Sequence, residues 1–245
     1  GNAIEVEEAV AKMGADVMRW QYASAPLSSV FRFGYGPAEE VTRKMLTLWN
    51  VYSFFVTYAN LPDCPEIVPD APVEGRSELD RWILARLHGL VATCNDRLGN
   101  FDAATTVRET EQFVDDLSTW YVRRSRRRFW KSGDDTDKQS AVQTLYDVLV
   151  TLSKIIAPIL PFSAEELYQS LVPTVDADAP ESVHLCAYPE PDTEIIDQGL
   201  LDDMDALMHV VGLGRSARNE AKMKVRQPAL RLLVKPSDAR QGETL

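Results

Sequence analysis

Apolar residues recur at steps of three and four along most of this chain, and this spacing limits the possible folds more than any other feature. In the stretch 37–60, Val41, Met45, Leu48 and Phe55 fall on one helical face. Similar patterns predict further helices at 4–22, 79–98, 103–131, 136–157, 163–171 and 195–222. Several amphipathic helices joined by short loops indicate a helix bundle. We therefore predict a mostly α fold.

The ends of these helices are marked by residues that suit helix termini. Pro37 fits the first helical position, and Asp102 can cap the helix that follows it. Ser77 with Asp80, and Ser163 with Glu166, resemble capping boxes. The indoles at helical spacing, Trp49, Trp82 and Trp120, are expected in the core.

Proline-rich stretches and one alternating segment separate the helical patterns from the remainder. Four prolines between 62 and 72 predict an extended connector, and the proline-rich, acidic stretch 173–194 predicts a linker. His184 and Leu185 could add a short strand, and Leu230, Leu232 and Val234 alternate as in a half-buried strand. The C-terminal part is therefore expected to begin a small α/β unit that is truncated.

Composition indicates an ordinary soluble protein rather than a membrane or secreted one. Of 245 residues, 45% are hydrophobic and 26% are charged, and no apolar run reaches the roughly 18 residues that span a bilayer. Cys64, Cys94 and Cys186 lie far apart, which predicts no disulfide framework or metal site and fits a reducing cytoplasm. The start at Gly1, without an initiator methionine, suggests an excised piece of a longer chain.

The sequence shows no recognisable catalytic centre. It has no HExxH, no G-x-S-x-G and no Walker loop, and its three histidines are scattered. The pair Gly212 and Gly214 lacks the third glycine of a dinucleotide fingerprint. A self-sufficient enzyme is therefore the weakest interpretation, and we expect no catalytic residue and no cofactor in these residues.

Positive charge is concentrated in the segment 120–131, although the whole chain has a formal net charge of −11. The segment reads Trp-Tyr-Val-Arg-Arg-Ser-Arg-Arg-Arg-Phe-Trp-Lys, with no acidic residue. Guanidinium groups pair with phosphate oxygens, and aromatic rings stack on unpaired bases. The candidate nucleic-acid ligands are Arg123, Arg124, Arg127, Arg128 and Trp130. The alternative is a solvated basic helix face paired with the chain's own acids.

A second basic segment spans 215–226. On a helix Arg215, Arg218 and Lys222 share one face, and Arg226 follows. Cations near the end of a helix complement its dipole, but this effect does not account for arginines a turn or two earlier. We therefore expect these four residues to extend the nucleic-acid-binding track.

Several motifs, in order along nearly the whole chain, resemble the C-terminal half of class I aminoacyl-tRNA synthetases, in particular the isoleucine enzymes. Residues 14–20 resemble a GAD-x-x-R-[LW] helix, and residues 79–84 resemble the opening of the anticodon-binding bundle. Residues 158–166 resemble an A-P-x-x-P-F-x-x-E element shared with the valine and leucine enzymes. The arginine string at 120–130 and the Arg-Gln-Pro segment at 226–228 are more similar to the isoleucine enzymes.

The resemblance implies a tRNA-binding part of a larger ligase. It implies a linker or stem-contact segment at 1–36, an anticodon-binding helix bundle of the class Ia synthetases at 37–190, and the start of a C-terminal unit at 191–245. The family's HIGH and KMSKS motifs are not in this sequence. Isoleucine activation with ATP and magnesium, and editing, would therefore belong to the missing catalytic part. The complete enzyme would be a cytoplasmic monomer and could carry zinc.

Two other interpretations remain open at this point. The first is a valine, leucine or methionine synthetase with the same tRNA-binding role. The second is a helical adaptor whose basic helix binds DNA or an acidic protein, which predicts that duplex DNA competes as well as tRNA does.

Overall fold

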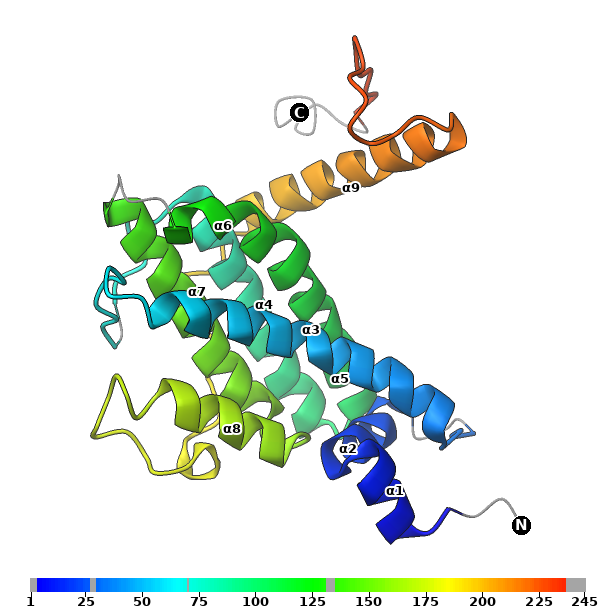
Figure 1. Ribbon diagram of the computed structural model, residues 1–245, viewed down its shortest axis with the longest axis vertical. Helices are drawn as coiled ribbons and strands as arrows, with labels where there is room; N and C mark the ends of the chain where they lie inside the picture. Colours follow the sequence, from blue (N-terminus) through cyan, green and yellow to red (C-terminus); the bar gives the residue numbers. More distant parts are fainter. Residues whose placement is uncertain (1–3, 27–29, 70, 131–134, 237–245) are drawn as a thin grey trace. The chain divides into compact units, whose positions relative to one another are not determined.

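The computed structural model describes residues 4–26, 30–69, 71–130 and 135–236, and within them the chain is helical and has no strand (Figure 1). The predicted mostly α fold is thereby confirmed. The chain divides into two compact units, Gly1–Ile196 and Asp197–Leu245. The functional segments expected at 1–36, 37–190 and 191–245 stay predictions.

The first unit is built on four long helices. These are α3 (Tyr35–Ala59), α4 (Glu78–Gly99), α5 (Ala103–Asp116) and α7 (Asp135–Ile156). Helix α4 packs against both α5 and α7, while α3 crosses over α5 and α7 (Figure 1). The apolar stripes seen in the sequence meet between them. Its largest fully buried side chains include Trp82, Phe113, Tyr121, Phe129, Leu145, Leu149 and Tyr168.

The helix predicted at 103–131 contains an irregularity that the apolar pattern did not reveal. After α5, the residues Leu117–Val122 form a π-helix, and α6 (Arg123–Trp130) continues from it. Lys131, the predicted end, lies outside the described residues. A π-helical turn holds an extra residue, which rotates every later side chain by about 100° relative to an unbroken α-helix. The arginines of α6 therefore point in directions set by this turn.

Two of the predicted helix caps are confirmed and a third is wrong. The N–H of Asp80 donates to Ser77 Oγ at 3.3 Å, and the N–H of Thr105 donates to Asp102 Oδ1 at 3.0 Å. Helix α8 (Pro161–Leu171) instead begins two residues before Ser163 and has no side-chain cap from its own N-cap residue. The N–H of Ser163 donates to Asp16 Oδ2 at 2.7 Å, so a carboxylate from another helix replaces the predicted local cap.

The first predicted helix, at 4–22, is two helices, α1 (Val6–Met13) and α2 (Ala15–Ser24). Gly14 separates them at a φ of 84°, which a glycine adopts without strain. Helix α2 packs on α3 and α5.

Arg19 and Trp20 of α2 contact the bundle directly. Arg19 donates to the carbonyl of Ile159 at 2.8 Å. Trp20 is 4% exposed and donates to Glu111 Oε1 at 2.9 Å. These contacts attach α2 to the bundle itself.

The expectation for the indoles is confirmed only in part. Trp82 is fully buried, whereas Trp49 and Trp120 are half-buried at the edge of the bundle. The ring of Trp120 lies under the guanidinium of Arg124, 4.4 Å from its carbon to the ring centroid. Apolar periodicity identifies the side of a helix that faces the core, but it does not show how far the neighbouring helices extend to cover each residue on that side.

The second unit begins with α9 (Gln198–Glu220), which Asp197 caps by accepting from the N–H of Leu200 at 3.0 Å. The strand predicted at 230–234 does not form, and Leu230, Leu232 and Leu233 are exposed. The strand predicted at 184–185, in the first unit, is a 3-10 helix, Val183–Leu185. A strand needs a neighbour that pairs its N–H and C=O groups, and the described residues offer none.

Candidate nucleic-acid interface

Helix α6 has two sides of opposite character. Ser125 and Phe129 are fully buried, as is Tyr121 in the π-helix just before α6, whereas four arginines of α6 are exposed. At 100° per residue these four fall within less than half of the helix circumference. We call them the outer arginine face: Arg123, Arg124, Arg126 and Arg127.

The outer arginine face forms no ion pair with any carboxylate in the described part of the chain. Its contacts are with aromatic rings: Arg124 lies over Trp120, and the guanidinium carbon of Arg126 lies 5.9 Å from the centroid of Phe54. Aromatic faces hold a guanidinium in place without neutralising its charge. Four cations that no described carboxylate neutralises therefore form a positive surface on one short helix of an acidic protein.

Trp130 extends this surface with an aromatic ring. Its side chain is 53% exposed, and its ring centroid lies 6.2 Å from that of Tyr58 on α3. The ring of the preceding residue, Phe129, packs against Phe54 at 4.9 Å and against Tyr58 at 6.0 Å. An exposed indole that packs against the half-buried ring of Tyr58 is suited to stack on an unpaired base.

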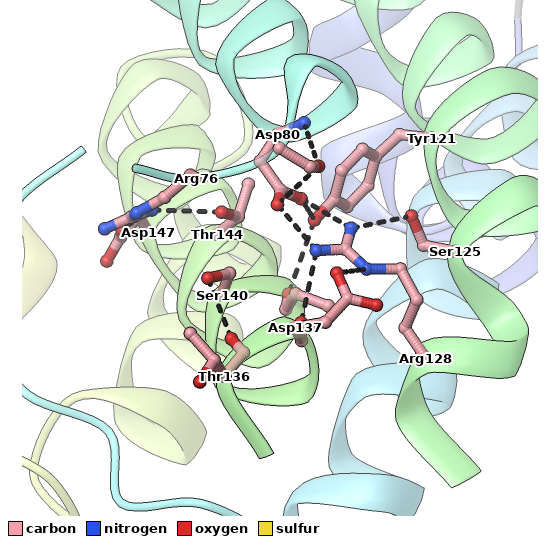
Figure 2. Close-up of polar contacts among 12 residues, drawn as sticks. Arg76, Asp80, Tyr121, Ser125, Arg128, Thr136, Asp137, Ser140, Thr144 and Asp147 are labelled. Carbon is pink, nitrogen blue, oxygen red and sulfur yellow. Dashed lines mark hydrogen bonds and ion pairs between the residues drawn. The ribbon is translucent and has the colours of Figure 1, made fainter. Parts of the chain in front are cut away.

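Arg128 does not belong to this surface. Figure 2 shows its guanidinium turned inward, with Nη1 donating to Asp80 Oδ1 at 2.8 Å and Nη2 donating to Asp80 Oδ2 at 2.6 Å. Its Nε donates to Asp137 Oδ1 at 2.7 Å, and the side chain is only 13% exposed. We therefore remove Arg128 from the proposed phosphate ligands, because it is already paired with the protein's own acids.

Asp80 is the centre of this arrangement and is fully buried. Tyr121 Oη donates to its Oδ1 at 2.7 Å, and Ser77 Oγ donates to its Oδ2 at 2.8 Å. Burial raises the pKa of Asp80, but the Arg128 pairing and these two hydroxyls outweigh it and leave the pKa below its usual value. The carboxylate is therefore charged at neutral pH. We call Ser77, Asp80, Tyr121, Arg128 and Asp137 the Asp80 network.

The sequence reasoning missed one member of the outer face, Arg126. Arg126 lies three residues after Arg123 and four before Trp130. On a helix this spacing places it on the same face as both, and it could have identified Arg126. The inward turn of Arg128 had no such local signal. Its partner Asp80 is 48 residues away in the sequence.

The second basic set lies on the second unit. Arg215 is exposed on α9, and Lys222 and Arg226 are exposed after its end. Arg218 already forms hydrogen bonds within the chain, because its Nη1 donates to the carbonyls of Lys224 at 3.2 Å and Gln227 at 2.6 Å. These bonds close the turn that follows α9, where Lys222 has a φ of 53°.

Two other kinds of site are not found in the described part of the chain. Within residues 4–26, 30–69, 71–130 and 135–236, no group of three or more His, Cys, Asp or Glu side chains could hold a metal ion. In the same residues, no helix has the length and hydropathy needed to cross a bilayer.

Comparison with known proteins places the bundle in a described family. Residues 80–234 match the family model of the anticodon-binding domain of tRNA ligase. Over 236 residues the chain is 50% identical to isoleucine–tRNA ligase of Dehalococcoides mccartyi, covering 95% of this chain and 23% of that protein. Over 248 residues it is 45% identical to isoleucine–tRNA ligase of Thermus thermophilus, covering 100% of this chain and 24% of that protein. The chain thus spans about a quarter of the length of these relatives.

A solved structure shares the fold. LeuRS of Agrobacterium radiobacter, crystallised as a ternary complex with tRNA and LeuAMS, superposes with a TM-score of 0.56 at 17% sequence identity. The match covers 80% of this chain and 22% of that one. At this level of identity the similarity concerns the architecture of the helices.

Proposed function

The chain belongs to the family of anticodon-binding domains of tRNA ligases, and from this we propose that it binds the anticodon stem and loop of an isoleucine tRNA as part of an isoleucine–tRNA ligase. The observation that carries the proposal is the outer arginine face, a set of guanidinium groups that form no ion pair with a described carboxylate and lie beside an exposed indole. The relatives named isoleucine–tRNA ligase, at 45% and 50% identity, support the choice of isoleucine.

The geometry suggests how the work is divided between these side chains. Arg123, Arg124, Arg126 and Arg127 would contact phosphates, which orients the RNA but carries little sequence information. Trp130 would stack on a base of the unpaired loop. On the second unit, Arg215, Lys222 and Arg226, with the free side of Arg218, would extend the contact to further phosphates.

The remaining steps of the ligase reaction would lie elsewhere in a longer polypeptide. The chain covers 23% of its relative, and its described residues provide no cluster that fits a metal. We propose that ATP, magnesium and any zinc are bound by other parts of the enzyme. The contacts proposed for the outer arginine face involve none of them.

The test is tRNA binding as a function of salt concentration. We expect Arg124→Ala with Arg127→Ala to weaken binding of an isoleucine tRNA transcript by about tenfold or more. The slope of log K against log salt should also decrease by about 0.7 to 0.9 for each phosphate that the variant no longer neutralises. Arg108→Ala is the matched control, because the Arg108 side chain is 68% exposed and lies on α5, away from the outer arginine face.

Two further comparisons distinguish the competing interpretations. Unchanged affinity and slope in the double variant would refute the role of the outer arginine face. Equal competition by duplex DNA would favour a general polyanion-binding adaptor. Equal binding of valine or leucine tRNA transcripts would remove the isoleucine assignment and leave the anticodon-binding role in place.

A further inference from the structure

The Asp80 network lies where three elements of the first unit meet. Asp80 is in the first turn of α4, Arg128 is on α6, and Asp137 is in the first turn of α7 (Figure 2). Ser77 is the N-cap residue of α4. We propose that Arg128 is a positioning residue for tRNA binding: by its two-point pairing with Asp80 it fixes the rotation of α6, and thereby the direction of the outer arginine face. This inference rests on the proposed function.

The Asp80 carboxylate is saturated with hydrogen bonds. Oδ1 accepts from Tyr121 and Arg128, and Oδ2 accepts from Ser77 and Arg128. Two oxygens offer about four acceptor positions, so each is used. A planar guanidinium that meets a fixed carboxylate at two points can take only one orientation. The carboxylate therefore determines where the Arg128 side chain, and the helix that carries it, can lie.

Helix α6 needs contacts with other helices to fix its orientation. The helix has eight residues, and Arg123 lies one turn from both Arg126 and Arg127, where like charges repel. As the end of the continuous helical stretch that begins at Ala103, α6 depends on tertiary contacts to resist this repulsion. Phe129 and Ser125 bury its inner side, and Arg128 supplies the hydrogen bonds that attach it to α4 and α7.

Arg128 cannot both hold Asp80 and contact a phosphate. For Arg128 to reach a phosphate it would have to leave Asp80, which is fully buried, without its counter-charge. An unpaired carboxylate in the interior is strongly unfavourable. The four exposed arginines carry no such cost, because none of them is paired with a described carboxylate. Arg128 is thus suited to hold the surface in place and not to be part of it.

The experiment uses three variants of the Asp80 network and an isoleucine tRNA transcript. Asp80→Asn removes a negative charge, so simple electrostatics predicts equal or tighter binding, whereas positioning predicts weaker binding. Arg128→Lys keeps the charge but loses the two-point geometry. Tyr121→Phe changes no charge and removes only the hydroxyl that orients Asp80. We expect the dissociation constant to rise about tenfold for the first two and about threefold for the third, with the salt slope unchanged.

Folding is measured alongside binding, by circular dichroism and by the stoichiometry of the titration. A variant that is only less stable lowers the fraction of active molecules and leaves the dissociation constant of the folded molecules unchanged. If Asp80→Asn does not fold, Tyr121→Phe and Arg128→Lys decide the question. A dissociation constant equal to or below that of the parent chain in these variants overturns the inference, and so does a decreased salt slope in Arg128→Lys.

The two proposals can fail separately. If Arg124→Ala with Arg127→Ala weakens binding while the variants of the Asp80 network bind normally, only the positioning role is wrong. If the arginine pair has no effect, the proposed function of the outer arginine face fails, and the positioning role fails with it.

Discussion

Phe129 and Trp130 are neighbours in the sequence, about 100° apart around α6, and both rings lie near Tyr58, yet their exposure differs. Phe129 is fully buried, with its ring centroid 4.9 Å from that of Phe54, whereas Trp130 is 53% exposed. The two rings therefore serve different purposes. One packs in the core of the bundle, and the other is available to a ligand.

We expect the two alanine variants at these positions to differ in kind. Phe129→Ala should lower the free energy of unfolding by about 3–5 kcal/mol, because it leaves a cavity among packed rings. Trp130→Ala should lower it by about 1 kcal/mol or less, since half of the indole is already in water, but it should weaken tRNA binding. Urea unfolding of both variants measures the change in stability, and tRNA titration measures the change in affinity. A large stability loss in Trp130→Ala would show that its ring belongs to the core.

Ser77→Ala tests the start of α4. The hydroxyl accepts from the N–H of Asp80 and donates to its carboxylate, so its removal should cost about 1–2 kcal/mol of stability. The matched control is Ser140→Ala, because Ser140 Oγ donates only to the carbonyl of Thr136, within its own helix. The control should be close to neutral in thermal unfolding. Equal effects of the two variants would mean that the cap contributes nothing specific.

Asp80 should make stability depend on acidity in a defined direction. Its pKa is lowered in the folded chain, so its stabilisation is present above the unfolded value of about 4 and is lost as the pH falls through the folded value. Asp80→Asn should therefore be less stable than the parent chain at pH 7, and the difference should shrink below about pH 4. Urea unfolding at a series of pH values measures the difference. A gap that stays constant into acid would contradict the assignment of a charged Asp80.

His88 should also make stability depend on pH, but nearer to neutrality than Asp80 does. Its Nδ1 accepts from the N–H of Asp192 at 3.0 Å, which requires the neutral ring. Burial lowers the pKa of His88, against the opposing charge of Asp192. As the pH falls, the ring takes up its proton near pH 6.5 in the unfolded chain and only at a lower pH in the folded chain. The stabilisation from the neutral His88 ring is therefore present above pH 6.5 and decreases as the pH falls.

Amide exchange at Asp192 measures this effect after correction for intrinsic rates. Protection should decrease between about pH 7 and 5, since a protonated imidazole can only donate. The N–H of Cys186 is the control, because it donates to the backbone carbonyl of Val183. His88→Ala should remove the pH dependence at Asp192 and leave Cys186 unaffected. Protection at Asp192 that does not change with pH would exclude the neutral ring as its acceptor.

Local features of the sequence determined most of the helical fold. The caps at Ser77 and Asp102 follow from a spacing of three residues, which helix geometry fixes wherever such residues occur. The apolar stripes likewise identify the inward face of each helix, as with Trp82. Periodicity could not reveal the π-helix Leu117–Val122, because one extra residue barely alters an apolar pattern.

What the tertiary structure alone decided is which charged groups are free and which are paired. In the sequence Arg127 and Arg128 are equivalent, yet the first is exposed and the second is paired with Asp80, 48 residues away. Asp16 capping α8, 147 residues away, is a similar case. Composition and short-range spacing fix the secondary structure because helix contacts are local. The fate of a charge depends on which distant segment packs beside it, and only the folded bundle brings those segments together.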